Sequence, residues 1–239
     1  MKRYISVFEM ITRSSIYKVL LIVTGMVVVE SVFFYLAVAN QQILSIEECI
    51  DESYYKVIFK IAYLLVTIAI VLPGMNLGSI QSYTLQRLRI KESRIFLLQA
   101  IYNMFAYMIL WGTQLLTILL NFLIFQKNLP EGAEMSNQTL FLAFYRNDFM
   151  HTILPLEDGP GWWMLALAGV TTAIAAATFT KLQRSGKFGF ELLLLVAAVL
   201  IYFPRAMGYD LAFILVTYVA IYCVMGMRVA NKYLGGDEA

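Results

Sequence analysis

Six long apolar runs fill most of this 239-residue chain and leave only short connections between them. About 20 apolar residues in helical form cross the ~30 Å hydrocarbon core of a bilayer, and the runs reach or approach that length. We therefore expect an all-α, polytopic membrane protein with six transmembrane helices, forming a single domain over 1–239. The runs cover residues 17–39, 57–80, 95–125, 161–180, 188–204 and 211–227.

Charged residues alternate between successive connections. Basic residues gather at the start of the chain, between the second and third runs, between the fourth and fifth, and after the sixth. The other connections carry most of the acids, including Glu47, Glu48, Asp51 and Glu52. Because basic loops stay on the cytoplasmic side, this pattern predicts that both termini are cytoplasmic.

Composition excludes several classes of function. The chain is 60% hydrophobic with a mean hydropathy of +0.71, which is far from the balance of a soluble domain. Its net charge of +2 gives no support for a nucleic-acid partner, and its single histidine, His151, leaves little for a metal site or a catalytic triad. We expect no cofactor, no nucleic-acid binding and no enzymatic activity in the chain itself.

Two flanking segments look amphipathic. Residues 1–16 repeat an apolar residue about every third position, which favours a helix in the cytoplasmic interface ahead of the first span; the alternative is a plain extension of that span. Residues 126–160 form the longest extracytoplasmic loop, and its stretch Thr139–Leu154 predicts a helix on the outer leaflet that ends at Pro155. Near the end of the second run, Pro73 predicts a bend or a helix end.

The connection 81–94 combines four basic residues with apolar ones. Basic residues here satisfy the positive-inside rule, but Leu85 and Leu88 are three positions apart and share one face of a short helix. Apolar side chains in a short cytoplasmic loop indicate a surface for a partner. We expect a docking helix in this segment.

The third run carries a polar stripe. At 100° per residue, six polar side chains fall within about 80° of one another, so we expect them to face other helices or a polar pathway. One interpretation is a set of interhelical hydrogen bonds of about 0.6 kcal/mol each, and the other is the lining of a substrate route. The six residues are Gln99, Asn103, Tyr107, Gln114, Thr117 and Asn121.

Glu30 stands in the middle of the first run. A carboxyl at that depth costs on the order of 2.5–3.5 kcal/mol, so it must face protein or water, or be neutral. It is either a residue of a proton or substrate path, or a buried, neutral carboxyl hydrogen-bonded to a neighbouring helix. We expect the second, with Glu30 facing the bundle or a partner subunit.

Together these features resemble the ABC-2 class of ABC-transporter permeases, in particular the short Gram-positive subunits that include lantibiotic-immunity and peptide-export proteins. The resemblance covers the whole chain and rests on the order of its segments. At residue level it rests on the sequence Tyr83-Thr-Leu-Gln-Arg-Leu-Arg-Ile, followed by Gln99 and by Tyr102-Asn103. The class has interfacial helices before the fifth span, whereas the amphipathic stretch here precedes the fourth.

The resemblance implies a location, partners and a mechanism. The chain would lie in a bacterial plasma membrane, pair with a second copy or a sister permease, and bind separate cytoplasmic ATPase subunits. Its coupling helix would include Tyr83, Leu85, Arg87, Leu88 and Arg89. The chain has no phosphate-binding G-x-x-x-x-G-K-[ST] motif, since its only Gly-Lys pair, Gly186-Lys187, is followed by Phe188. ATP would therefore be bound by the partner subunit.

Three functions remain open at this point. The leading one is a permease subunit that exports or extracts an amphipathic, lipid-like or peptide substrate with the energy of ATP hydrolysis. The second is a membrane sensor or scaffold that regulates a partner without moving a substrate. The third is a proton-coupled secondary transporter that uses Glu30.

Overall fold

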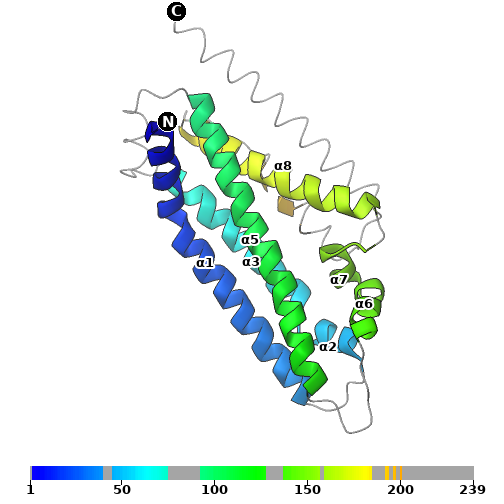
Figure 1. Ribbon diagram of the computed structural model, residues 1–239. Coiled ribbons are helices and arrows are strands. Elements are labelled where there is room, and N and C mark those ends of the chain that lie inside the picture. Colours follow the sequence, from blue (N-terminus) through cyan, green and yellow to red (C-terminus); the bar gives the residue numbers. More distant parts are fainter. Residues whose placement is uncertain are drawn as a thin grey trace, which may run out of the picture.

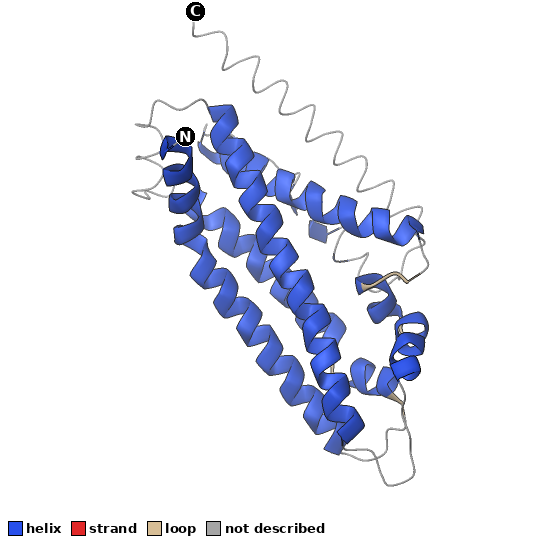
Figure 2. Ribbon diagram, viewed as in Figure 1, coloured by secondary structure: helices blue, strands red, loops and turns tan. Residues whose placement is uncertain are grey.

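A computed structural model describes residues 2–39, 45–74, 92–127, 137–156 and 159–184, together with 192, 193, 196, 197 and 200. The described elements are helices, and none of them is a strand (Figure 2). The sixth expected span, most of the fifth, and the residues Tyr83, Leu85, Arg87, Leu88 and Arg89 of the expected docking helix lie outside the described residues.

Three of the described helices are long and apolar enough to cross a membrane. They are α1 (Lys2–Ala39), α5 (Glu92–Lys127) and α8 (Gly159–Arg184), and they contain the first, third and fourth apolar runs. A fourth candidate is the pair α2 (Ile46–Glu52) and α3 (Tyr55–Val71), which meet at a bend of 51°. The described part therefore holds three candidate spans, or four if this bent pair is one span.

The bundle has an apolar exterior and a partly polar interior. Leu21 and Trp163 are about three-quarters exposed, at 74% and 76%, whereas Glu30 and Gln114 are fully buried. Apolar side chains cover the outer faces of α1, α5 and α8 because lipid, unlike water, imposes no cost on them. This arrangement is typical of a membrane-embedded protein.

The first 16 residues do not form a separate helix. They are the first turns of α1, which continues without a break to Ala39. One buried stripe runs through this segment, with Val7, Ile11 and Ser15 continuing into Val19. The expected break at residue 16 is therefore absent, because the same face that packs α1 inside the bundle extends to its N-terminal turns. At 1.5 Å per residue α1 is about 57 Å long, so it extends beyond a hydrocarbon core of ~30 Å.

The acidic connection after α1 is a helix where the sequence analysis expected a loop. Ser45 caps α2 by accepting a hydrogen bond from the Glu48 N–H at 3.3 Å. A serine followed three residues later by glutamate is the capping-box pattern, so a sequence signal for α2 existed. The bend between α2 and α3 falls at Tyr54, which has a φ of 56° in the left-handed region.

The α-helix of the second apolar run changes to a tighter turn at Pro73. The α-helix α3 stops at Val71, and the next three residues form the 3₁₀ turn η1 (Leu72–Gly74), which contains Pro73. Proline has no N–H to donate, and its ring clashes with the preceding turn, so a helix end at this point follows from the sequence. The run had been expected to continue to Ile80, but residues beyond Gly74 lie outside the described part until position 92.

The amphipathic stretch Thr139–Leu154 lies in two helices where one was expected. Asn147 ends α6 (Asn137–Arg146) and begins α7 (Asp148–Ile153), with its side-chain oxygen accepting hydrogen bonds from the N–H groups of Phe149 at 3.0 Å and Met150 at 3.1 Å. All but the first residue of α7 are buried, so α7 packs inside the protein and does not lie on the bilayer surface. Asparagine favours helix caps over helix interiors because its short side chain competes for backbone groups.

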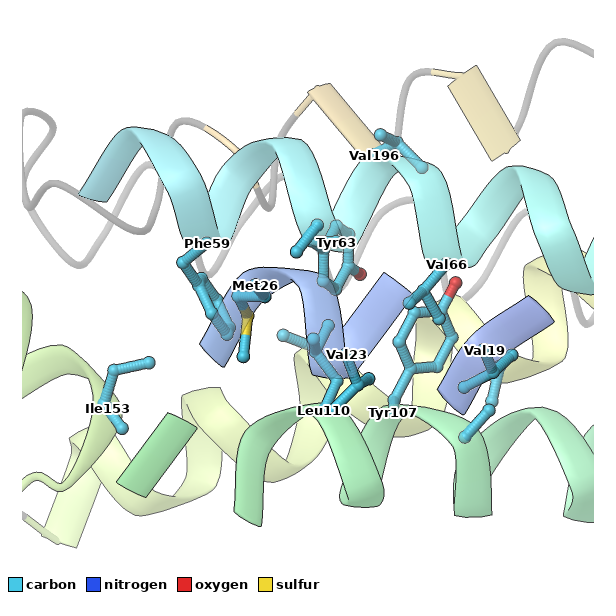
Figure 3. Packing of buried hydrophobic residues seen from close by; sticks show 14 of the residues in the cluster. Val19, Val23, Met26, Phe59, Tyr63, Val66, Tyr107, Leu110, Ile153 and Val196 are labelled. Atoms are coloured by element: carbon cyan, nitrogen blue, oxygen red, sulfur yellow. The ribbon is translucent and has the colours of Figure 1, made fainter. Parts of the chain in front are cut away.

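The helix α5 is the centre of the arrangement (Figure 1). Helices α1 and α8 pack along it, and α3 packs against α1, α5 and α8. The chain directions of α1 and α5 are parallel, since Arg94 at the start of α5 donates to the hydroxyl of Tyr4 at the start of α1. The helix α8 runs antiparallel to α5, with Lys181 near its end over the ring of Phe96, 5.9 Å from the centroid. Figure 3 shows apolar side chains of α1, α3 and α5 meeting between these helices.

Candidate functional site

The polar stripe of α5 lies inside the bundle. All six residues are buried, with exposed fractions between 0% for Gln114 and 6% for Tyr107. Glu30 of α1, at 0%, is buried too. The inward direction of the stripe therefore agrees with the 100° spacing of the sequence. Burial is compatible with both expected roles, interhelical hydrogen bonding and the lining of a substrate route. The hydrogen-bond partners of each side chain show which role it fits.

One part of the stripe belongs to a hydrogen-bonded network, which we name the paired cluster: Tyr63, Thr67, Tyr107 and Thr172. The Thr67 hydroxyl is 2.8 Å from the hydroxyl of Tyr107 and also donates to the carbonyl of Tyr63 at 2.8 Å. The Tyr63 hydroxyl donates to that of Thr172 at 2.8 Å, and the Tyr63 and Tyr107 rings stack with centroids 5.2 Å apart. These contacts connect α3 to both α5 and α8.

A second part is arranged differently, and we name it the Glu30–Gln114 pair. The Gln114 side chain of α5 faces the Glu30 carboxyl of α1. The two side chains are close enough to interact, but neither oxygen of Glu30 and neither polar atom of the Gln114 amide has a partner with the geometry of a direct hydrogen bond in the described structure. A buried polar group without a partner costs about 1–3 kcal/mol, and more when it is charged. Glu30 thus has the expected neighbour on another helix, Gln114 of α5, but the two side chains are not in direct hydrogen-bond geometry.

Apolar and aromatic side chains surround the Glu30–Gln114 pair along α1. Met26 and Phe34 lie one turn to either side of Glu30, and both are buried. The Phe34 ring packs edge-on against Tyr55 of α3, with centroids 6.3 Å apart. Asn121 of α5 donates to the Tyr55 hydroxyl. This hydroxyl also lies close enough to Glu30 to interact with its charge.

Asn103 occupies an intermediate position. Its amide nitrogen donates to the backbone carbonyl of Ala173 in α8 at 3.2 Å, whereas its side-chain oxygen has no partner. Thr117 donates to the carbonyl of Thr113 one turn earlier at 2.8 Å, so its hydroxyl is satisfied within α5. Gln99, nearest the start of α5, is buried at 4% exposure.

A cavity of about 310 Å³ lies between α3, α5 and α8, beside the paired cluster. Its lining is almost entirely apolar and aromatic, and the rings of Tyr63 and Tyr107 form part of it. Trp111 and Trp162 meet edge-on, with ring centroids 6.5 Å apart, and both line it. Sequence reasoning missed this cavity because it depends on which faces of three helices meet, and no local pattern encodes that.

No group of three or more His, Cys, Asp or Glu side chains among the described residues could hold a metal ion. The chemically distinct features of this part are thus the Glu30–Gln114 pair and the apolar cavity.

Comparisons with family models, with curated proteins and with solved structures found no match for the chain. The resemblance to ABC-2 permeases therefore has no support from these comparisons.

Proposed function

We propose that this chain is the membrane-spanning subunit of an ABC-2-type transporter. It would export, or extract from the bilayer, an amphipathic, lipid-like or peptide substrate, and a separate cytoplasmic ATPase would supply the energy. The same proposal includes six spans, cytoplasmic termini, a location in a bacterial plasma membrane, and pairing with a second permease.

The cavity between α3, α5 and α8 is the observation that carries this proposal. Its lining offers methionine and aromatic side chains, including Met104 and Met108, to an apolar group. Methionine fills irregular spaces and adapts to ligands of different shape. An amphipathic molecule could place its apolar part here while its polar part stays close to the hydroxyl groups of the paired cluster. A pocket of this kind inside a set of apolar helices favours transport over a purely structural membrane protein.

The proposed coupling helix provides the test. We expect Leu85→Asp combined with Leu88→Asp to leave insertion in the membrane unchanged, because both positions lie in a connection and not in a span. The double variant should lose both the bound ATPase and substrate-dependent ATP hydrolysis, because two charges replace the apolar contact surface. The measurement is purification of the tagged chain from its natural host membranes, followed by an assay of ATPase content and activity.

A matched control is Ile5→Asp, which changes an exposed isoleucine in the first turns of α1, outside both the apolar runs and the proposed docking face. It should retain the ATPase. An ATPase that stays bound and active in the double variant would contradict the coupling role of this segment. An ATPase that is absent already from the natural chain would contradict the proposed function as a whole.

A further inference from the structure

The Glu30–Gln114 pair brings four buried polar atoms close to one another, and none of them has a partner with the geometry of a direct hydrogen bond. We propose that this pair is a binding site for one monovalent cation, either a sodium ion or a proton. The proposal does not rest on the function proposed above, because it concerns what the buried carboxyl binds and not what the protein transports.

The balance of charge supports a cation. Among the described residues, the groups that interact with Glu30 are the Gln114 amide and the Tyr55 hydroxyl, and neither supplies a positive charge. Elsewhere in the described structure, Lys56 pairs with Asp51 at 3.4 Å. An isolated carboxylate in a low-dielectric interior is strongly unfavourable unless a positive charge neutralises it. One bound cation would bring the net charge of the site to zero.

The ligand atoms support a monovalent ion over a divalent one. Glu30 offers two oxygens and Gln114 offers its amide oxygen, which are hard ligands of the kind that suit alkali and alkaline-earth ions. Divalent sites usually draw on more carboxylates, and the described residues contain no cluster of three potential acidic or nitrogen and sulfur ligands. A single charge of +1 therefore matches the site. The Gln114 amide can present either its oxygen or its nitrogen by rotation about one bond.

The groups that interact with Glu30 come from two other helices: the Gln114 amide from α5 and the Tyr55 hydroxyl from α3. The buried Cys49 thiol of α2 interacts in turn with Tyr55. Among these groups, Glu30 is the one of a residue type that ordinarily loses its proton at acidic pH. A dependence on cations or pH that disappears when Glu30 is changed would therefore report on this site.

The test is a melting experiment on the purified full-length chain in detergent. One arm compares sodium chloride with choline chloride at equal ionic strength, and the other varies pH in choline chloride. A cation that binds only the folded state raises the melting temperature of the protein. Once the cation concentration exceeds its dissociation constant, each further increase of about fivefold adds roughly 2–4 °C. We expect the natural chain to respond in at least one arm, and Glu30→Gln to lose that response because an amide carries no charge.

Two further variants keep the test decisive. Gln114→Met removes one ligand oxygen at nearly constant volume, so it should weaken the response, and it stands in for Glu30→Gln if that variant does not fold. Glu9→Gln changes an exposed carboxyl on the same helix and should respond like the natural chain. A response to sodium identifies sodium as the ligand, and a response to pH alone identifies the proton. If the natural chain responds in neither arm, the proposal is wrong, and a bridging water is the better occupant of the site. The proposal is also wrong if Glu30→Gln and Gln114→Met respond in the same way as the natural chain.

Discussion

The two polar regions inside the bundle use similar side chains in opposite ways. In the paired cluster every hydroxyl has a partner, and the contacts connect α3, α5 and α8. In the Glu30–Gln114 pair a carboxyl and an amide face each other between α1 and α5, and none of their polar atoms has a partner with the geometry of a direct hydrogen bond. Satisfied polar groups hold helices together, whereas unsatisfied ones are costly and persist where a ligand or a function requires them. The first region therefore serves the fold, and the second is the candidate site.

The largest expected effect separates the paired cluster from the lipid-facing surface. We expect Tyr63→Ala to reduce the free energy of unfolding by about 3–5 kcal/mol, because it removes a buried ring stacked on Tyr107 and the hydrogen bond to Thr172. Thermal melting in detergent, followed by intrinsic fluorescence, measures this loss. The control is Tyr17→Ala, at a tyrosine that is 74% exposed, and it should change stability little. Equal losses in the two variants would mean that the paired cluster is not part of the core.

A smaller effect tests the hydrogen bonds of the paired cluster alone. Thr67→Val keeps the shape of the side chain but removes the partner of the Tyr107 hydroxyl, so we expect a loss of about 1–3 kcal/mol. The matched control is Thr12→Val, because the Thr12 hydroxyl is buried without a partner. That change should be neutral or slightly stabilising. If melting shows Thr12→Val to be the more harmful of the two, hydrogen bonding does not explain the stability of this region.

The smallest effect compares two amides on the same face of α5. Asn103→Leu loses a hydrogen bond of 3.2 Å to the Ala173 carbonyl, for which we expect a cost of about 0.6 kcal/mol in stability. Gln114→Leu loses no hydrogen bond, so its stability should stay close to that of the natural chain while any cation response is reduced. Melting in choline chloride and in sodium chloride measures both properties. A larger loss of stability in Gln114→Leu than in Asn103→Leu would show that Gln114 has a structural role.

Sequence reasoning reached the helices and the direction of their faces, but not the partners of the side chains. The apolar runs located α1, α5 and α8, and the 100° spacing placed Gln114 and Asn103 inside the bundle. The spacing did not show which of these side chains are hydrogen-bonded, because hydrogen bonding depends on the register between helices that are far apart in the chain. Local signals were also incomplete: Pro73 indicated the end of α3, whereas the capping role of Asn147 was overlooked.

The length of α1 shows a different limit. Amphipathic spacing in the first 16 residues is equally compatible with a helix in the membrane interface and with one packed against protein. The structure packs this segment on α5, where Ser15 donates to the Tyr102 hydroxyl at 2.8 Å and Phe8 meets the Tyr102 ring edge-on. The same apolar residues satisfy both arrangements, so periodicity alone could not decide between them.

The central claim is that the Glu30–Gln114 pair is a site and the paired cluster is part of the scaffold. The most direct test is the melting temperature of Glu30→Gln relative to that of Tyr107→Phe, measured in the same detergent and in sodium-free choline chloride. Tyr107→Phe leaves the Thr67 hydroxyl without this partner and should lower the melting temperature by roughly 2–4 °C, equivalent to about 1 kcal/mol. Glu30→Gln replaces an unpaired carboxyl and should leave the melting temperature unchanged or raise it. A fall in Glu30→Gln as large as that in Tyr107→Phe would contradict the distinction between the two regions.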